Sequence, residues 1–147
     1  MSQIKYENYV VDNLQYSTKK IEKLSISDFN EEEVSFQYSQ PTLGLSNDNK
    51  NIYFKSNINV KTKILEKPFR SISFELLVFY KMIPSDSDTI DDIVEKFNKE
   101  MFMLSLGKVK DIVKDVSQID YRPPVLMEDI SLPVKIKISE KKQGGAE

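Results

Sequence analysis

Residues 52–64, IYFKSNINVKTKI, decide the fold of this chain. The even positions carry the apolar side chains, and the odd positions carry tyrosine, lysine and asparagine. The apolar set is Ile52, Phe54, Ile58, Val60 and Ile64. A period of two sustained over this length predicts a β-strand with one face on a core and the other in water.

Three neighbouring segments show the same period and predict three more strands. Residues 21–28 alternate Leu24 and Ile26 with serines, and residues 34–38 alternate Val34, Phe36 and Tyr38 with polar side chains. Residues 72–80 begin with the same alternation and become apolar on both faces from position 76. Pro41 and Gly44 interrupt the alternation after residues 34–38, and residues 46–51 form a turn cluster before the strand at 52–64.

Helical patterns follow the strands. Thr89 with Asp92 three residues later matches a capping box, and apolar side chains then recur at helical spacing to Leu104. Gly107 predicts a break between this helix, over 89–106, and a second helix that ends before Tyr121. We expect residues 125–138 to be extended and residues 139–147 to form a disordered tail.

This order of elements predicts an α+β fold, with a four-stranded antiparallel sheet followed by two helices packed on one face. The 147 residues fit a single domain, 1–147, with its core at about 15–135. No stretch has the pattern of a signal peptide or the length of a membrane span, so we expect a cytoplasmic protein without membrane insertion.

The composition argues against catalysis and against a bound cofactor. The chain has no cysteine and no histidine, which removes the usual thiolate nucleophile and the side chain most used for acid–base chemistry. Four glycines cannot supply a phosphate-binding loop in addition to the turns. We therefore expect no enzyme activity, no cofactor and no metal.

Three groups of charged residues suggest sites of other kinds. Asp86, Asp88, Asp91 and Asp92 suggest a calcium loop, but the required glycine and glutamate are absent, and helix capping explains the aspartates better. Residues 31–33 are three glutamates, which are expected to form a solvated turn rather than an acid–base pair. The cations Lys55, Lys61, Lys63 and Arg70 lack the stacking aromatics of an RNA-binding sheet, and the net charge of −2 gives no field for nucleic acid.

The chain resembles the SecB family of export chaperones, most closely at 104–132, LSLGKVKDIVKDVSQIDYRPPVLMEDISL. Leu104 and Leu106 match an apolar pair of that family, Lys110 and Asp111 a basic–acidic pair, and Pro123 a turn. The closing alternation of the family is matched by Val125, Met127, Ile130 and Leu132, and residues 19–30 are similar to its first strand. The resemblance covers roughly residues 15–135 and implies the SecB fold.

Two departures bear on the partners. Gly107 stands where the family usually has proline, and the odd face of the strand at 52–64 is basic, whereas the family commonly presents an acidic sheet surface to the SecA motor. The basic face argues against docking to such a motor. SecB-like chaperones of toxin–antitoxin systems and uncharacterised SecB-fold relatives therefore match equally well.

The chain has more apolar surface than a sheet covered on one side requires, in residues 76–80 and around the last turn of the first helix. Four methionines in the second half suit a surface that adapts to unrelated sequences, although they could equally fill a core. We expect an ATP-independent chaperone for unfolded polypeptides, the alternative being an oligomeric adaptor for one folded partner.

The resemblance implies which residues would bind clients: Phe79, Met82, Phe102, Met103, Leu106, Val109 and Met127. The first helix is expected at the interface of a homo-oligomer, in SecB-like form a dimer of dimers, through Phe97, Met101 and Leu104.

Overall fold

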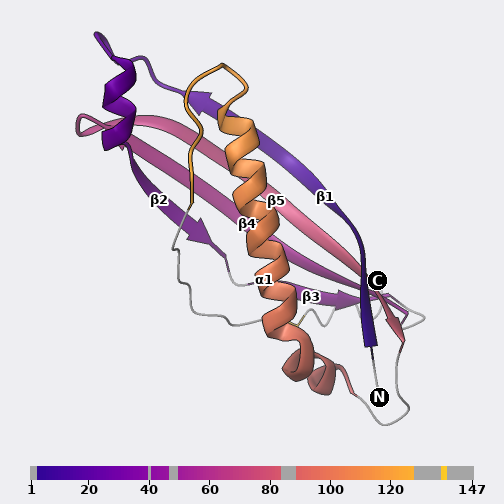
Figure 1. Ribbon diagram of the computed structural model, residues 1–147. Coiled ribbons are helices and arrows are strands. Elements are labelled where there is room, and N and C mark those ends of the chain that lie inside the picture. The colour runs from indigo at the N-terminus through magenta and orange to yellow at the C-terminus, as the bar shows by residue number, and fades with distance from the viewer. Residues whose placement is uncertain (1–2, 40, 47–49, 84–88, 128–136, 139–147) are drawn as a thin grey trace.

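The stretch at 52–64 forms strand β4, Asn51–Ile64, at the centre of a long twisted sheet (Figure 1). The computed structural model describes residues 3–39, 41–46, 50–83, 89–127 and 137–138. Its other elements are β1 (Gln3–Thr18), the 3₁₀ helix η1 (Ile26–Glu31), β2 (Glu33–Tyr38), β3 (Thr42–Leu45), β5 (Lys67–Ile83), the helix α1 (Ile90–Ser117) and β6 (Lys137–Ile138). The predicted α+β class, with an antiparallel sheet and helix on one face, is confirmed.

The sheet has six strands in the order β1-β5-β4-β3-β6, and β2 pairs with β4 beside β3. Strands β2 and β3 lie one after the other along the same edge of β4, and every pairing is antiparallel except that of β3 with β6. The prediction of four strands was therefore too low. The strands predicted at 34–38, 52–64 and 72–80 all occur, within β2, β4 and β5.

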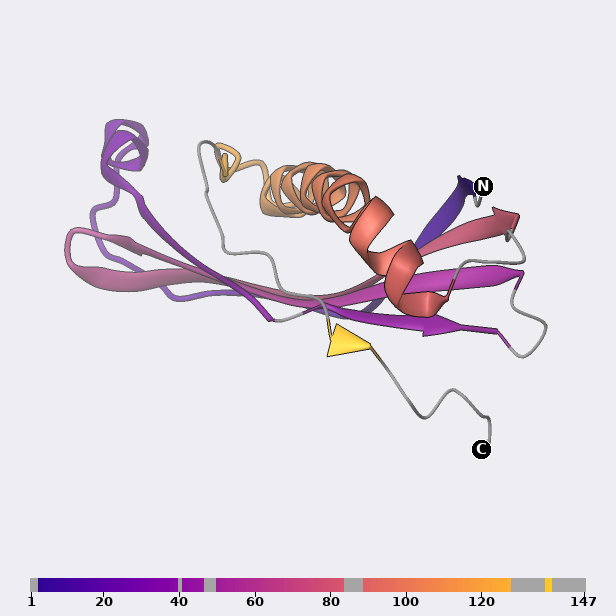
Figure 2. The ribbon, with the colours of Figure 1, turned by 90° about the horizontal axis from the view of Figure 1, so that it is seen from below.

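Helix α1 covers one face of this sheet, and Figure 2 shows the helix and the sheet as two layers. From Ile52 to Ile64 in β4 and from Arg70 to Met82 in β5, the even positions point toward the helix and are buried, whereas the odd positions are half-buried or exposed. From α1, the side chains of Ile93, Met101, Phe102, Leu106, Val109 and Val113 complete the core. We call this side the covered face and the opposite side, which carries the odd positions, the open face.

The strand predicted at 21–28 does not exist. Ser25 precedes η1, and its backbone N–H and hydroxyl both donate to Asp28 Oδ2, at 2.9 Å and 3.2 Å. The Asp28 N–H in turn donates to the Ser25 carbonyl oxygen at 3.0 Å. Lys23 has a φ of 60°, a left-handed conformation that an extended strand does not contain. The hydrogen bonds of the helix start therefore decide the local structure, and the short apolar alternation does not. The prediction that residues 19–30 resemble the first strand of the SecB family was wrong.

The first strand of the sheet is instead β1, which the pattern of apolar residues did not predict. It lies at the edge of the sheet and pairs only with β5 among the described strands. Two register shifts, between Tyr6 and Asn8 and between Asp12 and Gln15, exchange the faces along its length. Because of these shifts, apolar and polar side chains do not alternate regularly in the sequence.

The break predicted at Gly107 does not occur either, and one helix replaces the predicted two. α1 begins with the predicted capping box, in which the Asp92 N–H donates to Thr89 Oγ1 at 3.2 Å and the Thr89 N–H donates to Asp92 Oδ2 at 2.9 Å. Gly107 lies on the exposed side of the helix. Glycine in a helix costs only about 1 kcal/mol relative to alanine, which the packing of a long apolar stripe readily offsets.

The sequence pattern does not predict strand β3, because Gly44 interrupts the alternation there. On the open face the ring of Tyr53 lies against Gly44, its partner in the register, and a Cβ there would collide with the ring. The glycine is therefore a packing site for an aromatic side chain inside the sheet.

Part of the C-terminal prediction lies outside the described residues, including 128–136 and the tail at 139–147. Residues 123–127 are described as non-regular chain, and Lys137–Ile138 form the short strand β6. No helix within the described ranges is long and apolar enough to cross a membrane.

Candidate polypeptide-binding surfaces

A buried polar cluster fixes α1 on the covered face. The hydroxyl of Tyr38 on β2 lies 2.8 Å from Ser105 Oγ on α1 and accepts a hydrogen bond from Ser56 Oγ on β4 at 2.7 Å. The Tyr38 ring also packs edge-on against Phe102, with 5.3 Å between ring centroids. Burial raises the pKa of Tyr38. Ser56 and Ser105 interrupt the apolar patterns of β4 and α1 because both are hydrogen-bond partners of Tyr38.

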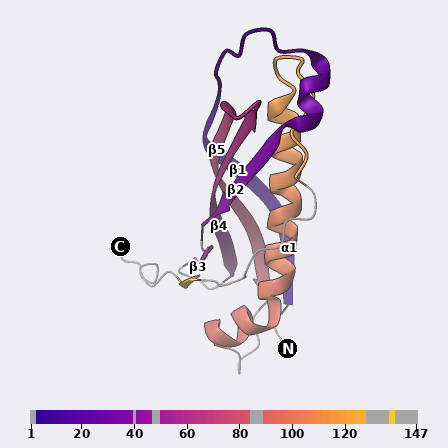
Figure 3. The same cartoon turned by 90° about the vertical axis from the view of Figure 1, so that its left-hand side faces the viewer.

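A second buried cluster holds the far end of α1. Arg70, which is only 2% exposed, forms a bidentate ion pair with Glu32 and donates to the carbonyl oxygens of Ser117 at 3.0 Å and Pro123 at 2.8 Å. Its guanidinium also lies 5.2 Å from the centre of the Phe29 ring. Figure 3 shows η1 beside the C-terminal end of α1, where this cluster lies.

These contacts correct two predictions. Arg70 cannot belong to an exposed cationic face with Lys55, Lys61 and Lys63, because it lies in the interior. Glu32 is not part of a solvated turn, because its side chain is 7% exposed and fully engaged by Arg70. Spacing in the sequence gave no signal for this pair, since the two residues are brought together by tertiary contact.

Most of the predicted client-binding residues lie in the core of the monomer. Met82, Phe102, Leu106, Val109 and Met127 are at most 6% exposed, between the sheet and α1 or beside it. They are close together, as expected for one surface, but α1 and the segment after it cover them. They could contact a client only if these covering segments moved.

The other two predicted client-binding residues lie on opposite sides of the molecule. Met103 is 57% exposed on the outer side of α1, and Phe79 is half-buried on the open face of β5. Among the predicted interface residues, Met101 is fully buried, whereas Phe97 and Leu104 are half-buried at the edge of the core. The outer side of α1 at Met103 and Leu104 also borders a shallow hollow of about 360 Å³.

Strand β1 carries exposed apolar side chains that the sequence analysis did not single out. Tyr6, Tyr9, Val10 and Leu14 are 36–46% exposed along this edge strand. The ammonium group of Lys108 on α1 lies 5.3 Å and 4.9 Å from the ring centres of Tyr6 and Tyr9, so the two rings partly cover the gap between β1 and the helix. A long edge with unpaired backbone groups and apolar side chains is a surface onto which another strand can add.

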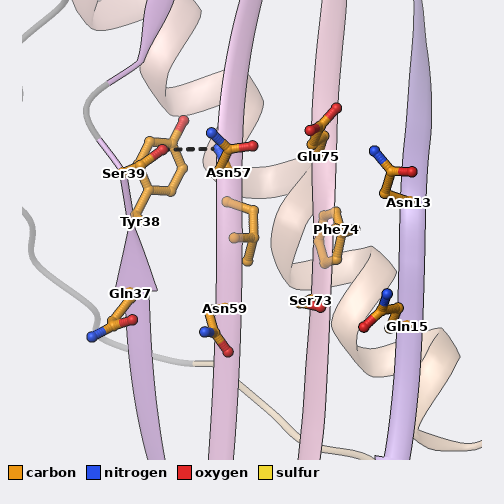
Figure 4. A pocket seen from close by; sticks show the side chains of 11 residues that line it. Asn13, Gln15, Gln37, Tyr38, Ser39, Asn57, Asn59, Ser73, Phe74 and Glu75 are labelled. Atoms are coloured by element: carbon orange, nitrogen blue, oxygen red, sulfur yellow. Dashed lines mark hydrogen bonds between the residues drawn. The ribbon is translucent and has the colours of Figure 1, made fainter.

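The open face contains a hollow of about 550 Å³ that crosses four strands, shown in Figure 4. Most of the residues that line it have polar, uncharged side chains, with amides from β1, β2 and β4 and hydroxyls from Ser39, just after β2, and Ser73 on β5. We call it the amide groove and define it by Asn13, Gln15, Gln37, Ser39, Asn57, Asn59, Ser73 and Glu75, with Tyr38, Ile58 and Phe74 also contributing. The sequence analysis recognised only that these odd positions are polar.

A third hollow, of about 860 Å³, lies beside η1 at the end of the molecule held by Arg70. Phe29 and Phe69 form part of its lining, with Lys20, Lys23 and Arg122 around them. Arg122 is paired with Asp120 at 2.7 Å and stacks over Phe69. The aspartate also accepts from the hydroxyl of Tyr16, whose pKa burial and this carboxylate both raise.

No group of three or more acidic side chains in the described part of the chain is placed to hold a metal ion. Asp91 and Asp92 lie in the first turn of α1, where they favour the helix N-terminus. Asp86 and Asp88, the other two aspartates that suggest a calcium loop in the sequence, lie outside the described residues.

The described architecture, an antiparallel sheet with one long helix across it, is similar to a solved SecB-like chaperone. This is Rv1957 of Mycobacterium tuberculosis, determined in complex with a ChAD peptide from the HigA1 antitoxin Rv1956, with a TM-score of 0.70 at 10% identity over 89% of this chain and 93% of that one. A protein of unknown function from Streptococcus agalactiae gives a TM-score of 0.40 at 17% identity, over 87% and 98% of the two chains. No family model and no curated protein matches the sequence.

The chain therefore has a SecB-like fold, as the resemblance in its sequence implied.

Proposed function

We propose that this protein is a homo-oligomeric, ATP-independent chaperone of the cytoplasm that binds non-native polypeptides. The observation that carries the proposal is a SecB-like fold that leaves apolar side chains exposed along edge strand β1 and on the outer side of α1. The similar chaperone of M. tuberculosis was solved with a bound peptide, which supports a polypeptide as the ligand. Exposed apolar surface of this kind favours association with other chains.

The proposed oligomer uses β1 in addition to the predicted helix surface. Pairing of β1 with a second copy would satisfy its free backbone groups and cover Val10 and Leu14. The half-buried side chains Phe97 and Leu104 remain available for a second contact between subunits. Met101 is fully buried in the core and cannot contact a second subunit directly. Light scattering of the purified protein at micromolar concentration tests this part, and a monomer would contradict it.

The chaperone activity is tested by aggregation of several unrelated denatured proteins, such as citrate synthase, insulin and lysozyme, with the purified protein and no nucleotide. We expect aggregation of all of them to slow. A requirement for ATP, or no effect on any of them, would contradict the proposal.

A dedicated adaptor is the second candidate, because the peptide bound to the similar chaperone comes from one particular antitoxin. Such an adaptor would protect one partner and leave unrelated denatured proteins to aggregate. The breadth of the aggregation assay therefore separates the two functions.

A further inference from the structure

The amide groove is a hollow lined mainly by polar residues, on the face of the sheet opposite α1. Five of its residues, Asn13, Gln15, Gln37, Asn57 and Asn59, carry side-chain amides, and Glu75 is the single charged residue in its lining. We propose that the amide groove binds the main chain of an extended polypeptide whose apolar side chains lie on neighbouring apolar residues of the open face. This inference rests on the proposed function and names a site for the client.

The first argument is chemical identity. A side-chain amide has the same carbonyl acceptor and N–H donors as a peptide group, so it can bond to a main chain of any sequence. The strand register places Gln37 beside Asn59, Asn59 beside Ser73, and Ser73 beside Gln15. These four polar side chains form a row across four strands, with about 4.8 Å between neighbours.

The second argument is that the central amide does not hold the fold together. Asn59 Oδ1 is enclosed and has no hydrogen-bond partner in the described structure. Leaving such an enclosed acceptor unpaired destabilises the protein. A turn of the amide toward a ligand breaks no internal bond of this oxygen, and a main-chain N–H would supply the missing donor.

The third argument is the apolar surface that continues from the groove. Leu77 pairs with Val10, and Phe79 pairs with Tyr53, at two and four positions along β5 from Glu75. All four side chains belong to the open face. Residues of one face recur about every 6.8 Å along a strand, and an extended peptide has the same two-residue repeat. A peptide parallel to β4 and β5 would therefore place successive side chains over successive rows.

Because Glu75 is the single charged residue of the lining, the groove suits a polypeptide better than a charged ligand, and the adjoining apolar residues favour a polypeptide over a carbohydrate. Main-chain recognition is tolerant of sequence, as a chaperone requires, and the apolar residues add affinity that depends little on salt.

The experiment uses a short fluorescent peptide of alternating leucine and serine, and the same peptide with alternate main-chain nitrogens methylated. Methylation removes N–H donors and leaves the protein unaltered. We expect it to weaken binding to the wild type about tenfold, since two lost hydrogen bonds of about 0.7 kcal/mol each amount to that factor. Asn57→Ala combined with Asn59→Ala should weaken the unmethylated peptide similarly and no longer discriminate between the two peptides.

Lys61→Ala is the matched control, because Lys61 lies on the open face of β4 two residues from Asn59 and outside the groove. It should bind both peptides like the wild type. Equal binding of both peptides by the wild type, or an unchanged affinity in the double variant, would overturn the inference while leaving the proposed function intact. Binding of maltohexaose that the double variant loses, with peptide binding unaffected, would reassign the groove to carbohydrate. A wild type that binds neither peptide nor any denatured protein would contradict the proposed function itself.

Discussion

Arg70 and Glu32 form a bidentate ion pair inside the protein, with Nη2 2.8 Å from Oε1 and Nε 3.0 Å from Oε2. The two side chains are 0% and 7% exposed. Arg70 also donates hydrogen bonds to the carbonyl oxygens of Ser117 and Pro123, so a single guanidinium joins β5, the end of η1 and the end of α1. This pair holds the helix in place at one end of the sheet, and the cluster around Tyr38 holds it near the middle.

Glu32→Gln should therefore destabilise the protein by about 3–5 kcal/mol, because it leaves a buried guanidinium without its counter-charge. Urea unfolding followed by circular dichroism measures the change. Asp120→Asn is the matched control, since the Arg122–Asp120 pair is about one third exposed and should contribute about 1 kcal/mol or less. Equal effects of the two variants would show that the buried pair is no more important than the surface pair.

Tyr80 predicts how stability depends on pH. Its hydroxyl is buried without a hydrogen-bond partner in the described structure, and burial raises its pKa well above the ordinary value of 10.0. The unfolded chain loses this proton near pH 10, whereas the folded protein keeps it. The free energy of unfolding should therefore be unaffected below that pH and fall as the pH rises above it.

Tyr80→Phe removes the unpartnered hydroxyl and keeps the ring. We expect it to raise the free energy of unfolding at pH 7 by about 1 kcal/mol and to make the alkaline loss of stability less steep. Unfolding in urea at pH 7 and at several values above pH 9 measures both effects. Tyr121→Phe, at a side chain that is 98% exposed, should change the stability at pH 7 by less than about 0.5 kcal/mol. A destabilised Tyr80→Phe protein would contradict the prediction.

Two glycines should respond oppositely to alanine. Gly107→Ala should stabilise the protein by up to about 1 kcal/mol, because the position is helical and a Cβ there meets nothing within 4 Å. Gly44→Ala should destabilise it by about 1–3 kcal/mol, because the new methyl group collides with the Tyr53 ring. Thermal melting of the two variants measures the difference.

The collision has its own test. Tyr53→Ala in the Gly44→Ala background removes the ring, so the second substitution should cost less there than in the wild type. Additive effects of the two substitutions would show that the ring does not cover Gly44.

The two sides of α1 separate folding from binding. Met101→Asp should strongly destabilise the protein and lower its melting temperature, since an unpaired charge in the core costs about 3–5 kcal/mol of a total stability of about 5–15 kcal/mol. Met103→Asp, at a side chain that is 57% exposed, should leave the melting temperature unchanged. If the outer side of α1 binds clients, this second variant should also protect denatured proteins less well.

A substitution of Leu106 should not be combined with one of Met103 to test client binding. It is 6% exposed, and its truncation to serine should cost about 2–5 kcal/mol through the cavity it leaves. Lost binding in a Met103→Ser, Leu106→Ser protein would therefore reflect unfolding as well as a changed surface. Unaltered protection by Met103→Asp would remove the outer side of α1 from the candidate binding surfaces.

The sequence by itself determined the central strands, the start of α1 and the α+β class. In β4 the even positions are apolar except for Ser56 and Thr62, and in α1 the capping box is complete within four residues. Such signals are local, because strand faces and helix caps depend on residues two to four positions apart. The SecB-like fold was implied by the resemblance of the chain to the SecB family, which is strongest at 104–132.

Only the tertiary structure decided which side chains are surface and which are core. Met82, Phe102 and Val109 look the same in the sequence whether they line a groove or fill an interior, and the position of α1 over the sheet buries them. The same holds for Arg70, whose partner Glu32 is 38 residues away. The bulged strand β1 and the amide groove arise from pairings between distant strands, and burial by a distant segment leaves no period in the sequence that it covers.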